Sequence, residues 1–449
     1  MSDATPVLIL GGGMSGLGAA HAALDAGIEF QLLDGADRLG GVLETVEDGG
    51  GRYERAASAT LFRDPAGWAL FDKATRGEWI EPDPAFHARM VRRADDRLVT
   101  IGPGAFFGGL FTPLDLLRIL REPLRARGRA PDSLADFVRA RLGENFYRNG
   151  LFPLTAGVYA GDPERISWRH AFPRMHARAG EGSLVLSLFK SAPGPRMDRK
   201  FVSGRGGMGA LVRRLAEALP ARALHPSTRV ELMRRDGGQF VVSAHAPAGA
   251  REFRAARVIL ATDAANAAQL LAPLAPAAAR LARIPHAPLA ILHLRFKSAA
   301  LTLPRALGFL NALGAGAGDL GCLLHSNMFP NRAPAGEFAL SIYFGGVRQP
   351  DWVDPARHDD AALIAAGCAT LQKLGLLATG AHPTQSAVVR WARAIPQYEV
   401  DHPEVLDAAA EIERALPGLK IAGNYLRGNG AGDCFSGGVG VMREIVGKG

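Results

Sequence analysis

The sequence contains few of the residues that mark secreted, metal-binding or membrane-spanning proteins. Its three cysteines, Cys322, Cys368 and Cys434, lie far apart and form no C-x-x-C pair, which excludes the common zinc and dithiol spacings and indicates a reducing compartment. The chain has no apolar run of about 18 residues, so hydropathy predicts no membrane-spanning helix. The first strand is expected to start after five residues, which leaves no room for a signal peptide, and we expect a cytoplasmic protein.

Sets of residues that carry out catalysis without a cofactor are also missing. We find no Ser/His/Asp arrangement, no cluster with metal-ligand spacing and no obvious pair of carboxylates. A bound cofactor is therefore expected to carry the chemistry, and no metal site is expected.

Positive charge is concentrated in one segment. Residues 113–205 contain 17 Lys and Arg against 9 Asp and Glu, whereas the rest of the chain is balanced. A basic segment suits nucleic acid, an anionic membrane or an acidic ligand. Because no helix-turn-helix, zinc-finger or RNP pattern occurs, we expect no nucleic-acid partner. A basic surface that is merely solvated stays an alternative.

The most informative pattern is a G-x-G-x-x-G loop at the start of the chain. It follows an apolar strand from Pro6 and precedes a helix that reaches about Ala26, and the next strand ends at Asp34. The first glycine suits the tight turn, the second allows close approach of a pyrophosphate, and the third leaves room for the helix. The Asp34 carboxylate would accept a hydrogen bond from a ribose hydroxyl. The sequence therefore predicts a dinucleotide site whose loop comprises Gly11, Gly12, Gly13, Met14, Ser15 and Gly16.

A second glycine pair favours FAD over NAD. Arg38 and the glycines Gly40 and Gly41 directly follow the ribose carboxylate. They offer a second backbone approach and a cation near the same pyrophosphate. A plain turn stays an alternative for these residues.

Helical patterns dominate residues 91–200. Thr112 and Pro113 form a helix start, and leucines then recur on one face with arginines opposite them. We expect the apolar face to pack on the protein's own core, with docking on an anionic membrane surface as the alternative. The residues involved are Phe106, Phe107, Leu110, Phe111, Leu114, Leu117, Leu120 and Leu124, with Arg118, Arg121, Arg125, Arg127 and Arg129.

The length and the patterns together predict an α/β protein. A Rossmann-type FAD-binding domain would be built from separated segments, beside an antiparallel or mixed-sheet substrate domain and a helical domain. We assign 1–90, 201–284 and 386–449 to the FAD-binding domain, 91–200 to the helical, membrane-associating domain and 285–385 to the substrate domain.

Four segments carry a family resemblance: 11–41, 155–173, 390–398 and 422–438. They resemble the oxygen-dependent porphyrinogen oxidases, amine-oxidase-like flavoproteins that include protoporphyrinogen oxidase and bacterial coproporphyrinogen oxidase. The stretches Gly157–Pro163 and Ile395–Tyr398 look specific to this branch. The resemblance implies non-covalent FAD, an acidic tetrapyrrole substrate and oxygen as acceptor. Further FAD-contacting positions implied by it are Val42, Ala56, Ala57, Ser58, Ala59, Val230, Trp391, Ala431, Gly432 and Asp433.

The implied reaction removes six electrons from a porphyrinogen in three flavin turnovers, and a flat macrocycle then needs apolar walls and cations for its propionates. Our candidates are Phe309, Leu310 and Phe344 for the walls and Arg174 and Arg178 for the propionates. The amphipathic stretch favours protoporphyrinogen IX over coproporphyrinogen III.

Two departures from the family pattern keep other functions open. Val42 replaces a basic or large polar residue, and Ala56 and Ala57 replace a glycine and a proline. Asp401 also replaces a common glycine, for which we have no physical account. An amine oxidase or desaturase, or a flavin-binding protein without turnover, stays an alternative.

Overall fold

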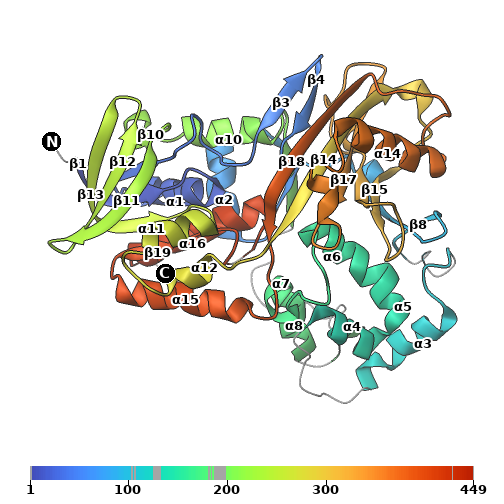
Figure 1. Ribbon diagram of the computed structural model, residues 1–449, viewed down its shortest axis with the longest axis horizontal. Coiled ribbons are helices and arrows are strands. Elements are labelled where there is room, and N and C mark those ends of the chain that lie inside the picture. Colours follow the sequence, from blue (N-terminus) through green and yellow to red (C-terminus); the bar gives the residue numbers. More distant parts are fainter. Residues whose placement is uncertain are drawn as a thin grey trace.

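The computed structural model describes residues 3–102, 105, 108–124, 133–180, 183, 185–186, 199–426 and 428–447. Figure 1 shows two lobes with a sheet in each and a group of helices below the second lobe. Segments from both ends of the chain meet in the first lobe.

The sheet of the first lobe has seven strands, in the order β10-β2-β1-β13-β12-β11, with β19 also paired to β13. β1 runs parallel to β2 and β13, whereas β12 is antiparallel to both of its neighbours, β11 and β13. The strands are β1 (Asp3–Leu10), β2 (Phe30–Leu33), β10 (Leu224–His225), β11 (Arg229–Asp236), β12 (Gln239–Ala246), β13 (Gly249–Leu260) and β19 (Leu419–Ile421).

Helices cover both faces of this sheet. Alternate residues of β1 point to opposite faces, so Val7 and Ile9 belong to one apolar core and Leu8 and Leu10 to the other. The arrangement confirms the expected Rossmann-type lobe. The first core contains α1 (Met14–Asp25), α2 (Pro65–Thr75), α10 (Met208–Glu217) and α16 (Ala431–Ile445), and the second contains α11 (Ala264–Leu271), α12 (Ala278–Leu281) and α15 (His402–Ala415).

Helices α1 and α16 cross at glycines, although they come from opposite ends of the chain. A Cβ on Gly18 would lie 2.1 Å from the Phe435 carbonyl oxygen, and one on Gly438 would lie 1.9 Å from that of Ser15. Both glycines are therefore required for the close approach.

The second lobe holds a seven-stranded sheet in the order β18-β14-β17-β16-β15-β7-β8, antiparallel except for the parallel pair β15 and β7. This sheet takes strands from outside 285–385: two come from residues 88–100, and β18 extends to residue 396. Helix α14 (Asp360–Lys373) packs on one face. The remaining elements are β7 (Ala88–Arg92), β8 (Leu98–Thr100), β14 (His286–Lys297), β15 (Ala306–Asn311), β16 (Asp319–Leu323), α13 (His325–Met328), β17 (Glu337–Gly345) and β18 (Gln385–Pro396).

Short strands lie between the lobes. They form a hairpin of β3 (Thr45–Asp48) with β4 (Gly51–Glu54), and a three-stranded sheet of β5 (Thr60–Phe62), β9 (Lys200–Gly204) and β6 (Trp79–Ile80).

The predicted start of the helical region at residue 91 is wrong, because β7 and β8 extend the second sheet to Thr100, but the first helix begins at the predicted Thr112–Pro113 pair. Thr112 caps α3 and forms a capping box with Asp115, and Pro113 is the first helical residue. No helix in the described parts of the chain is long and apolar enough to cross a membrane. The helices are α3 (Pro113–Arg121), α4 (Leu134–Leu142), α5 (Glu144–Phe146), α6 (Phe152–Tyr159), α7 (Trp168–Ala171) and α8 (Pro173–Gly180).

The expectation that the apolar face of α3 packs on the core is wrong. Leu114, Leu117 and Leu120 of α3 are 55%, 41% and 64% exposed, and Leu124, in the 3-10 helix that directly follows (Glu122–Leu124), is 84% exposed. The apolar loop before the helix packs inward instead, because Leu110 is buried and the Phe111 ring stacks on Phe146. Phe106, Phe107, Arg125, Arg127 and Arg129 lie outside the described residues.

A buried ion pair joins the two lobes. Glu54, at the end of β4, accepts from Arg332 Nη1 at 3.2 Å, from Thr45 Oγ1 at 2.7 Å and from the Met208 N–H at 3.1 Å. Arg332 follows α13 and also donates to Ser203 Oγ at 2.8 Å. Burial raises the pKa of Glu54, and the guanidinium of Arg332 opposes that rise. Three separated segments therefore meet at one buried carboxylate.

Replacing Glu54 by Gln should destabilise the protein strongly. The Glu54→Gln variant leaves the buried Arg332 guanidinium without its counter-charge, so we expect the free energy of unfolding to fall by about 3 kcal/mol in chemical denaturation. Glu47 is the control, because its side chain is 74% exposed and lies 3.8 Å from Arg52. Glu47→Gln should change stability by less than about 0.5 kcal/mol. Equal effects of the two substitutions would contradict a central role for Glu54.

Candidate functional site

The glycine loop has the geometry of a phosphate cradle. Gly11 has φ of +104°, and a Cβ on Gly16 would lie 1.8 Å from the Gly11 carbonyl oxygen. A Cβ on Gly13 would meet no atom within 4 Å. Gly13 is also the N-cap of α1, where Met14 and Ser15 begin the helix. The loop is therefore closed around Gly11 and Gly16 and open at Gly13, beside a helix N-terminus that favours an anion.

Asp34 holds this loop in place. Its carboxylate accepts from the Gly12 N–H at 2.6 Å and from the Ala36 N–H at 2.8 Å. Each carboxylate oxygen keeps a lone pair for a ribose hydroxyl. The Thr228 N–H donates to the Asp34 carbonyl at 2.7 Å, which brings the start of β11, and with it Val230, to the same edge.

The second glycine pair packs on the first loop. The Gly40 N–H donates to the Gly12 carbonyl at 2.7 Å, and a Cβ on Gly41 would lie 3.3 Å from the Gly13 Cα. Arg38 does not have the free guanidinium that we expected near the pyrophosphate. It donates to the Gly41 carbonyl at 3.0 Å, and also to the Leu43 carbonyl and to Glu44. Arg38 therefore closes its own loop, and the adjacent Val42 is 54% exposed.

Helix α16 brings a second N-terminus to the site. The Gly432 N–H donates to Thr60 Oγ1 at 2.6 Å, and Asp433 forms an ion pair with Arg63 at 3.1 Å. Ala431 is the first residue of the helix. The start of α16 is thus fixed against β5, beside the helix that carries the glycine loop.

Residues 56–59 connect β4 to β5 and lie between the lobes. Ser58 is buried, and its carbonyl accepts from Ser203 Oγ at 2.7 Å. Ala57 is exposed, whereas Ala56 and Ala59 are partly buried against separate cores. Trp391, on β18, donates from Nε1 to the Arg55 carbonyl at 2.7 Å. The structure thus brings Trp391 beside this segment.

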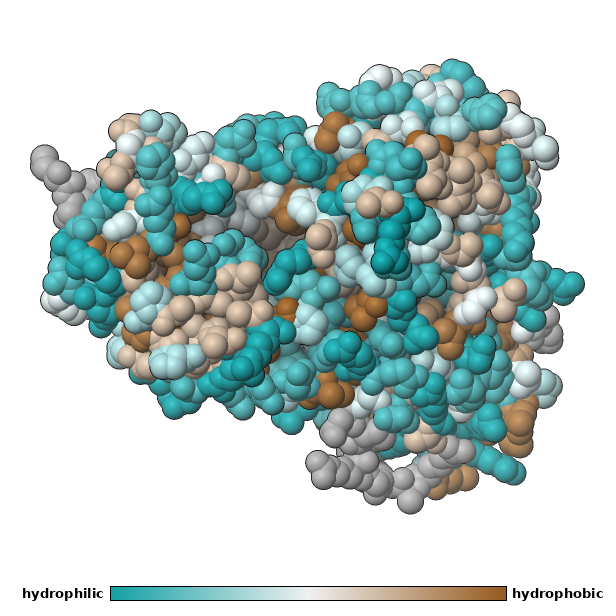
Figure 2. Space-filling model, viewed as in Figure 1, coloured by the Kyte–Doolittle hydropathy of each residue, from teal (hydrophilic) through white to brown (hydrophobic). Residues whose placement is uncertain are grey.

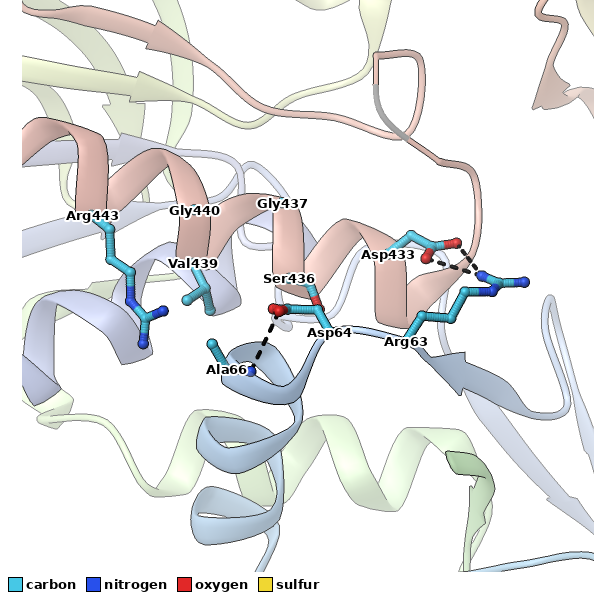
Figure 3. Close-up of a pocket in the computed structure, with 9 residues that line it drawn as sticks. All are labelled: Arg63, Asp64, Ala66, Asp433, Ser436, Gly437, Val439, Gly440 and Arg443. Atoms are coloured by element: carbon cyan, nitrogen blue, oxygen red, sulfur yellow. Dashed lines mark hydrogen bonds and ion pairs between the residues drawn. The ribbon is translucent and has the colours of Figure 1, made fainter. Parts of the chain in front are cut away.

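Figure 3 shows a groove between α16 and the start of α2, with Arg63 and Asp433 paired at one end and Arg443 at the other. Its volume is about 390 Å³. The residues that line the groove come from residues 63–66 and from α16, and none of them belongs to the dinucleotide loop. Ser436, Gly437 and Gly440 supply its α16 side.

The predicted substrate walls are partly wrong. Phe309 and Phe344 are buried in the core between the second sheet and α14, so they do not face the site. Successive residues of a strand point to opposite faces, so their neighbours Leu310 and Tyr343 face the other way. Leu310 contacts Gly157 of α6. The alternation in 337–344 predicts that Tyr343 and Phe344 lie on opposite faces of the sheet. The sequence does not show which of the two faces packs on α14 and which faces the site.

Tyr343 lies against the segment that precedes β5. Its ring belongs to an apolar cluster with Tyr53, Ile291 and Trp391. Burial raises the pKa of the Tyr343 phenol, and an interaction with the Ser58 side chain opposes that rise. The phenol therefore stays protonated at neutral pH and can donate a hydrogen bond.

The same face of the sheet carries two buried histidines joined by a hydroxyl. Ser341 Oγ lies 2.7 Å from His293 Nδ1 and 2.7 Å from His325 Nε2. Burial lowers the pKa of His293 and His325 to about 3 each, so both rings are neutral. This set cannot be identified from the sequence, because its three residues lie on two separate strands and a short helix.

The two predicted propionate-binding arginines lie on α8, and the side chains of Arg174 and Arg178 lie outside the described residues. No group of three His, Cys, Asp or Glu among the residues described could hold a metal ion.

The residues present fit FAD. Gly13 has an open Cα at the N-terminus of α1, and the Asp34 carboxylate accepts from the same loop. Helix α16 packs on α1 at Gly438, and its first turn bonds to Thr60, directly after residues 56–59. The open glycine and the helix N-terminus suit a pyrophosphate, and the carboxylate suits a ribose.

Comparisons with known proteins agree with this geometry. The family described as flavin containing amine oxidoreductase matches residues 14–441. The chain is 26% identical to protoporphyrinogen oxidase 1 of Spinacia oleracea, over 98% of this chain and 84% of the relative. It is 25% identical to the coproporphyrinogen III oxidase of Bacillus subtilis, over 99% of both. A crystal structure from Exiguobacterium, provisionally described as a protoporphyrinogen oxidase, matches with a TM-score of 0.80 at 22% identity over 99% of both chains. These relatives confirm the resemblance found in the sequence.

Alanine at Gly13 should separate cofactor binding from folding. A methyl group there meets no protein atom, so we expect the stability of the FAD-free protein to change by less than about 1 kcal/mol. The same methyl group occupies the space that a pyrophosphate needs, so the FAD dissociation constant should rise at least about tenfold in equilibrium dialysis.

Gly437→Ala is the matched control, because a Cβ there also meets no atom within 4 Å but lies in the groove beside α2. It should leave FAD affinity unchanged. Equal FAD affinity of the two variants would mean that the pyrophosphate binds elsewhere.

Proposed function

Because the chain belongs to the flavin containing amine oxidoreductase family, we propose that it oxidises a porphyrinogen to a porphyrin in haem synthesis, with protoporphyrinogen IX as preferred substrate and oxygen as acceptor. One observation carries this proposal. The two stretches that look specific to porphyrinogen oxidases, 157–163 and 395–398, are in direct contact through Gln397, which donates to the Tyr159 carbonyl at 2.9 Å. Relatives named protoporphyrinogen oxidase and coproporphyrinogen III oxidase support it.

FAD is the cofactor of this enzyme family, and this chain's residues would hold it non-covalently. When bound, FAD supplies the redox chemistry by accepting electrons from the substrate and passing them to an acceptor. Cys434 lies near the start of α16, but its Sγ is directed at the Gly428 carbonyl at 3.7 Å. Burial raises the pKa of Cys434 to about 12, so no thiolate is available for attachment at neutral pH.

The protein would contribute walls and orientation rather than a catalytic base. Leu310 and Tyr343 lie on the face of the second sheet that α6 and residues 53–58 cover, and Val158 of α6 is 41% exposed. An apolar macrocycle held between this face and the flavin would be oriented for transfer of hydrogen from a carbon. The protonated phenol of Tyr343 would donate a hydrogen bond and would not act as a base.

Two substrates should be compared directly. We expect a higher kcat/KM for protoporphyrinogen IX, with two carboxylates, than for coproporphyrinogen III, with four, because the exposed face of α3 favours delivery from a membrane surface. Porphyrin fluorescence measures the product, and FAD-free protein controls for spontaneous oxidation in air. The reverse order would assign the chain to coproporphyrinogen III, and turnover of neither would favour an amine oxidase, a desaturase or a flavin carrier.

We also propose that α3 docks on an anionic membrane surface. Its exposed leucines lie beside Arg118 and Arg121, and Figure 2 shows hydrophobic side chains gathered over this helix at the lower right. Exposed leucines on a short basic helix suit the boundary between headgroups and acyl chains. Basic residues near such a surface contribute about 1 kcal/mol each and are screened by salt.

Removing two leucines should weaken vesicle binding. The double variant Leu120→Ser, Leu124→Ser should lower co-sedimentation with anionic liposomes at least about fivefold at low salt, because it removes the two most exposed apolar side chains of this surface. Raising the salt should also release the wild-type protein. Leu232→Ser is the control, since Leu232 is 45% exposed on the first lobe. No pelleting of the wild-type protein at low salt would exclude the membrane proposal.

A further inference from the structure

We propose that Gln397 and Tyr398 are positioning residues that hold the substrate-side end of α6 and the FAD-side loop before α16 at a fixed separation. This inference rests on the proposed function, because it takes α6 as a wall of the substrate site. Both residues are 2% exposed and directly follow β18, and they lie between the end of α6 and the loop before α16.

Tyr398 holds the loop that leads into α16. Its Oη donates to the Asn424 carbonyl at 2.6 Å and accepts from the Gly428 N–H at 2.7 Å. One buried hydroxyl thus satisfies two backbone groups on either side of the turn. Among the residues described, Asn424 and Gly428 belong to no helix or strand, so the bonds to the phenol help to set the position of the loop.

Gln397 holds the other side. Its Nε2 donates to the Tyr159 carbonyl at 2.9 Å, at the last residue of α6, and to the Ile395 carbonyl at 2.9 Å. A Cβ on Gly161 would lie 2.4 Å from Gln397 Oε1, so the chain after α6 packs directly on this amide. The carboxyl end of α6 is therefore fixed to the residue before Tyr398.

Further contacts make this link rigid. The Ser167 N–H donates to the Tyr398 carbonyl at 2.8 Å, and Arg165 pairs with Glu399 at 2.7 Å. The Tyr398 ring also stacks on His402, at 4.3 Å between ring centroids. The segment from Gln397 to Glu399 is thus held by contacts within the protein that need no ligand.

The two sides also meet directly across the site. Asn429, just before α16, donates from Nδ2 to the Val158 carbonyl of α6 at 3.3 Å. Movement of the loop would therefore displace both the N-terminus of α16 and the exposed residues of α6. Tyr398 should set how well FAD is held, and Gln397 should set how the macrocycle is presented to it.

Tyr398→Phe tests the cofactor side. The variant keeps the ring but removes the hydrogen bonds of the hydroxyl to the Asn424 carbonyl and the Gly428 N–H, so FAD must order a looser loop. We expect the FAD dissociation constant of the holoenzyme to rise about tenfold in equilibrium dialysis. The visible circular dichroism of the bound flavin should change with it. A purely structural role would lower thermal stability and leave both of these measurements unchanged.

Tyr425→Phe is the matched control. Tyr425 is fully buried in the same loop, and its hydroxyl has no hydrogen-bond partner among the residues that the structure describes. The FAD affinity of the Tyr425→Phe variant should stay within about twofold of wild type. Equal affinities of the Tyr398 and Tyr425 variants would overturn the proposal. If Tyr398→Phe does not fold, hydrogen exchange decides: the Gly428 amide of wild type should be protected, and free exchange overturns the proposal.

Gln397→Met tests the substrate side, because methionine matches the glutamine in shape and lacks its donor. We expect KM for the porphyrinogen to rise at least about threefold while FAD affinity stays within about twofold. Gln372→Met, at an exposed position of α14, controls for the substitution itself. An unchanged KM, or a loss of FAD affinity equal to that of Tyr398→Phe, would overturn the division of roles. The FAD titrations use no porphyrinogen, so they decide the cofactor side even if wild type oxidises neither substrate.

Discussion

The ion pair between Glu54 and Arg332 determines how the two lobes meet. Glu54 ends the hairpin that leads into residues 56–59, and Arg332 belongs to the second lobe. Both are almost fully buried, and their remaining polar atoms bond to Thr45, Ser203 and the start of α10. A buried charge without its partner is costly, so neither lobe can shift without loss of this contact. The segment nearest the expected flavin is therefore placed by electrostatics as much as by apolar packing.

The parts of the fold that sequence could predict are those with local causes. The G-x-G-x-x-G loop requires glycine at Gly11, which has a positive φ, and at Gly16, where a Cβ would lie 1.8 Å from a carbonyl oxygen. Such local requirements can be recognised from a few consecutive residues. The start of α3 was equally legible, since Thr112 and Pro113 act within one helical turn. The same local logic predicted that Asp34 and the second glycine pair lie at the loop, and the structure places them there.

The parts that could not be predicted depend on distant contacts. Period-two alternation shows that Phe344 and Tyr343 face opposite ways, but only the position of α14 decides that Phe344 is core. Arg38 looked free for a phosphate because its acceptors are mostly backbone carbonyls, which a sequence does not display. The leucines of α3 have the pattern of a core-facing helix, and no feature of that pattern reveals that they stay exposed in the described part of the chain.

The crossing of α1 and α16 has a consequence for how the protein is made. Helix α1, which begins at residue 14, completes its packing only against α16, which ends at residue 445. One edge of β1 likewise pairs with β13, which follows it by more than 200 residues. During synthesis the ribosome therefore releases nearly the whole chain before this half can close. Its apolar surface stays open for that time, whereas the second lobe, built mostly from contiguous strands, can fold earlier. The nascent chain should thus depend on chaperones in its first segment more than in its middle.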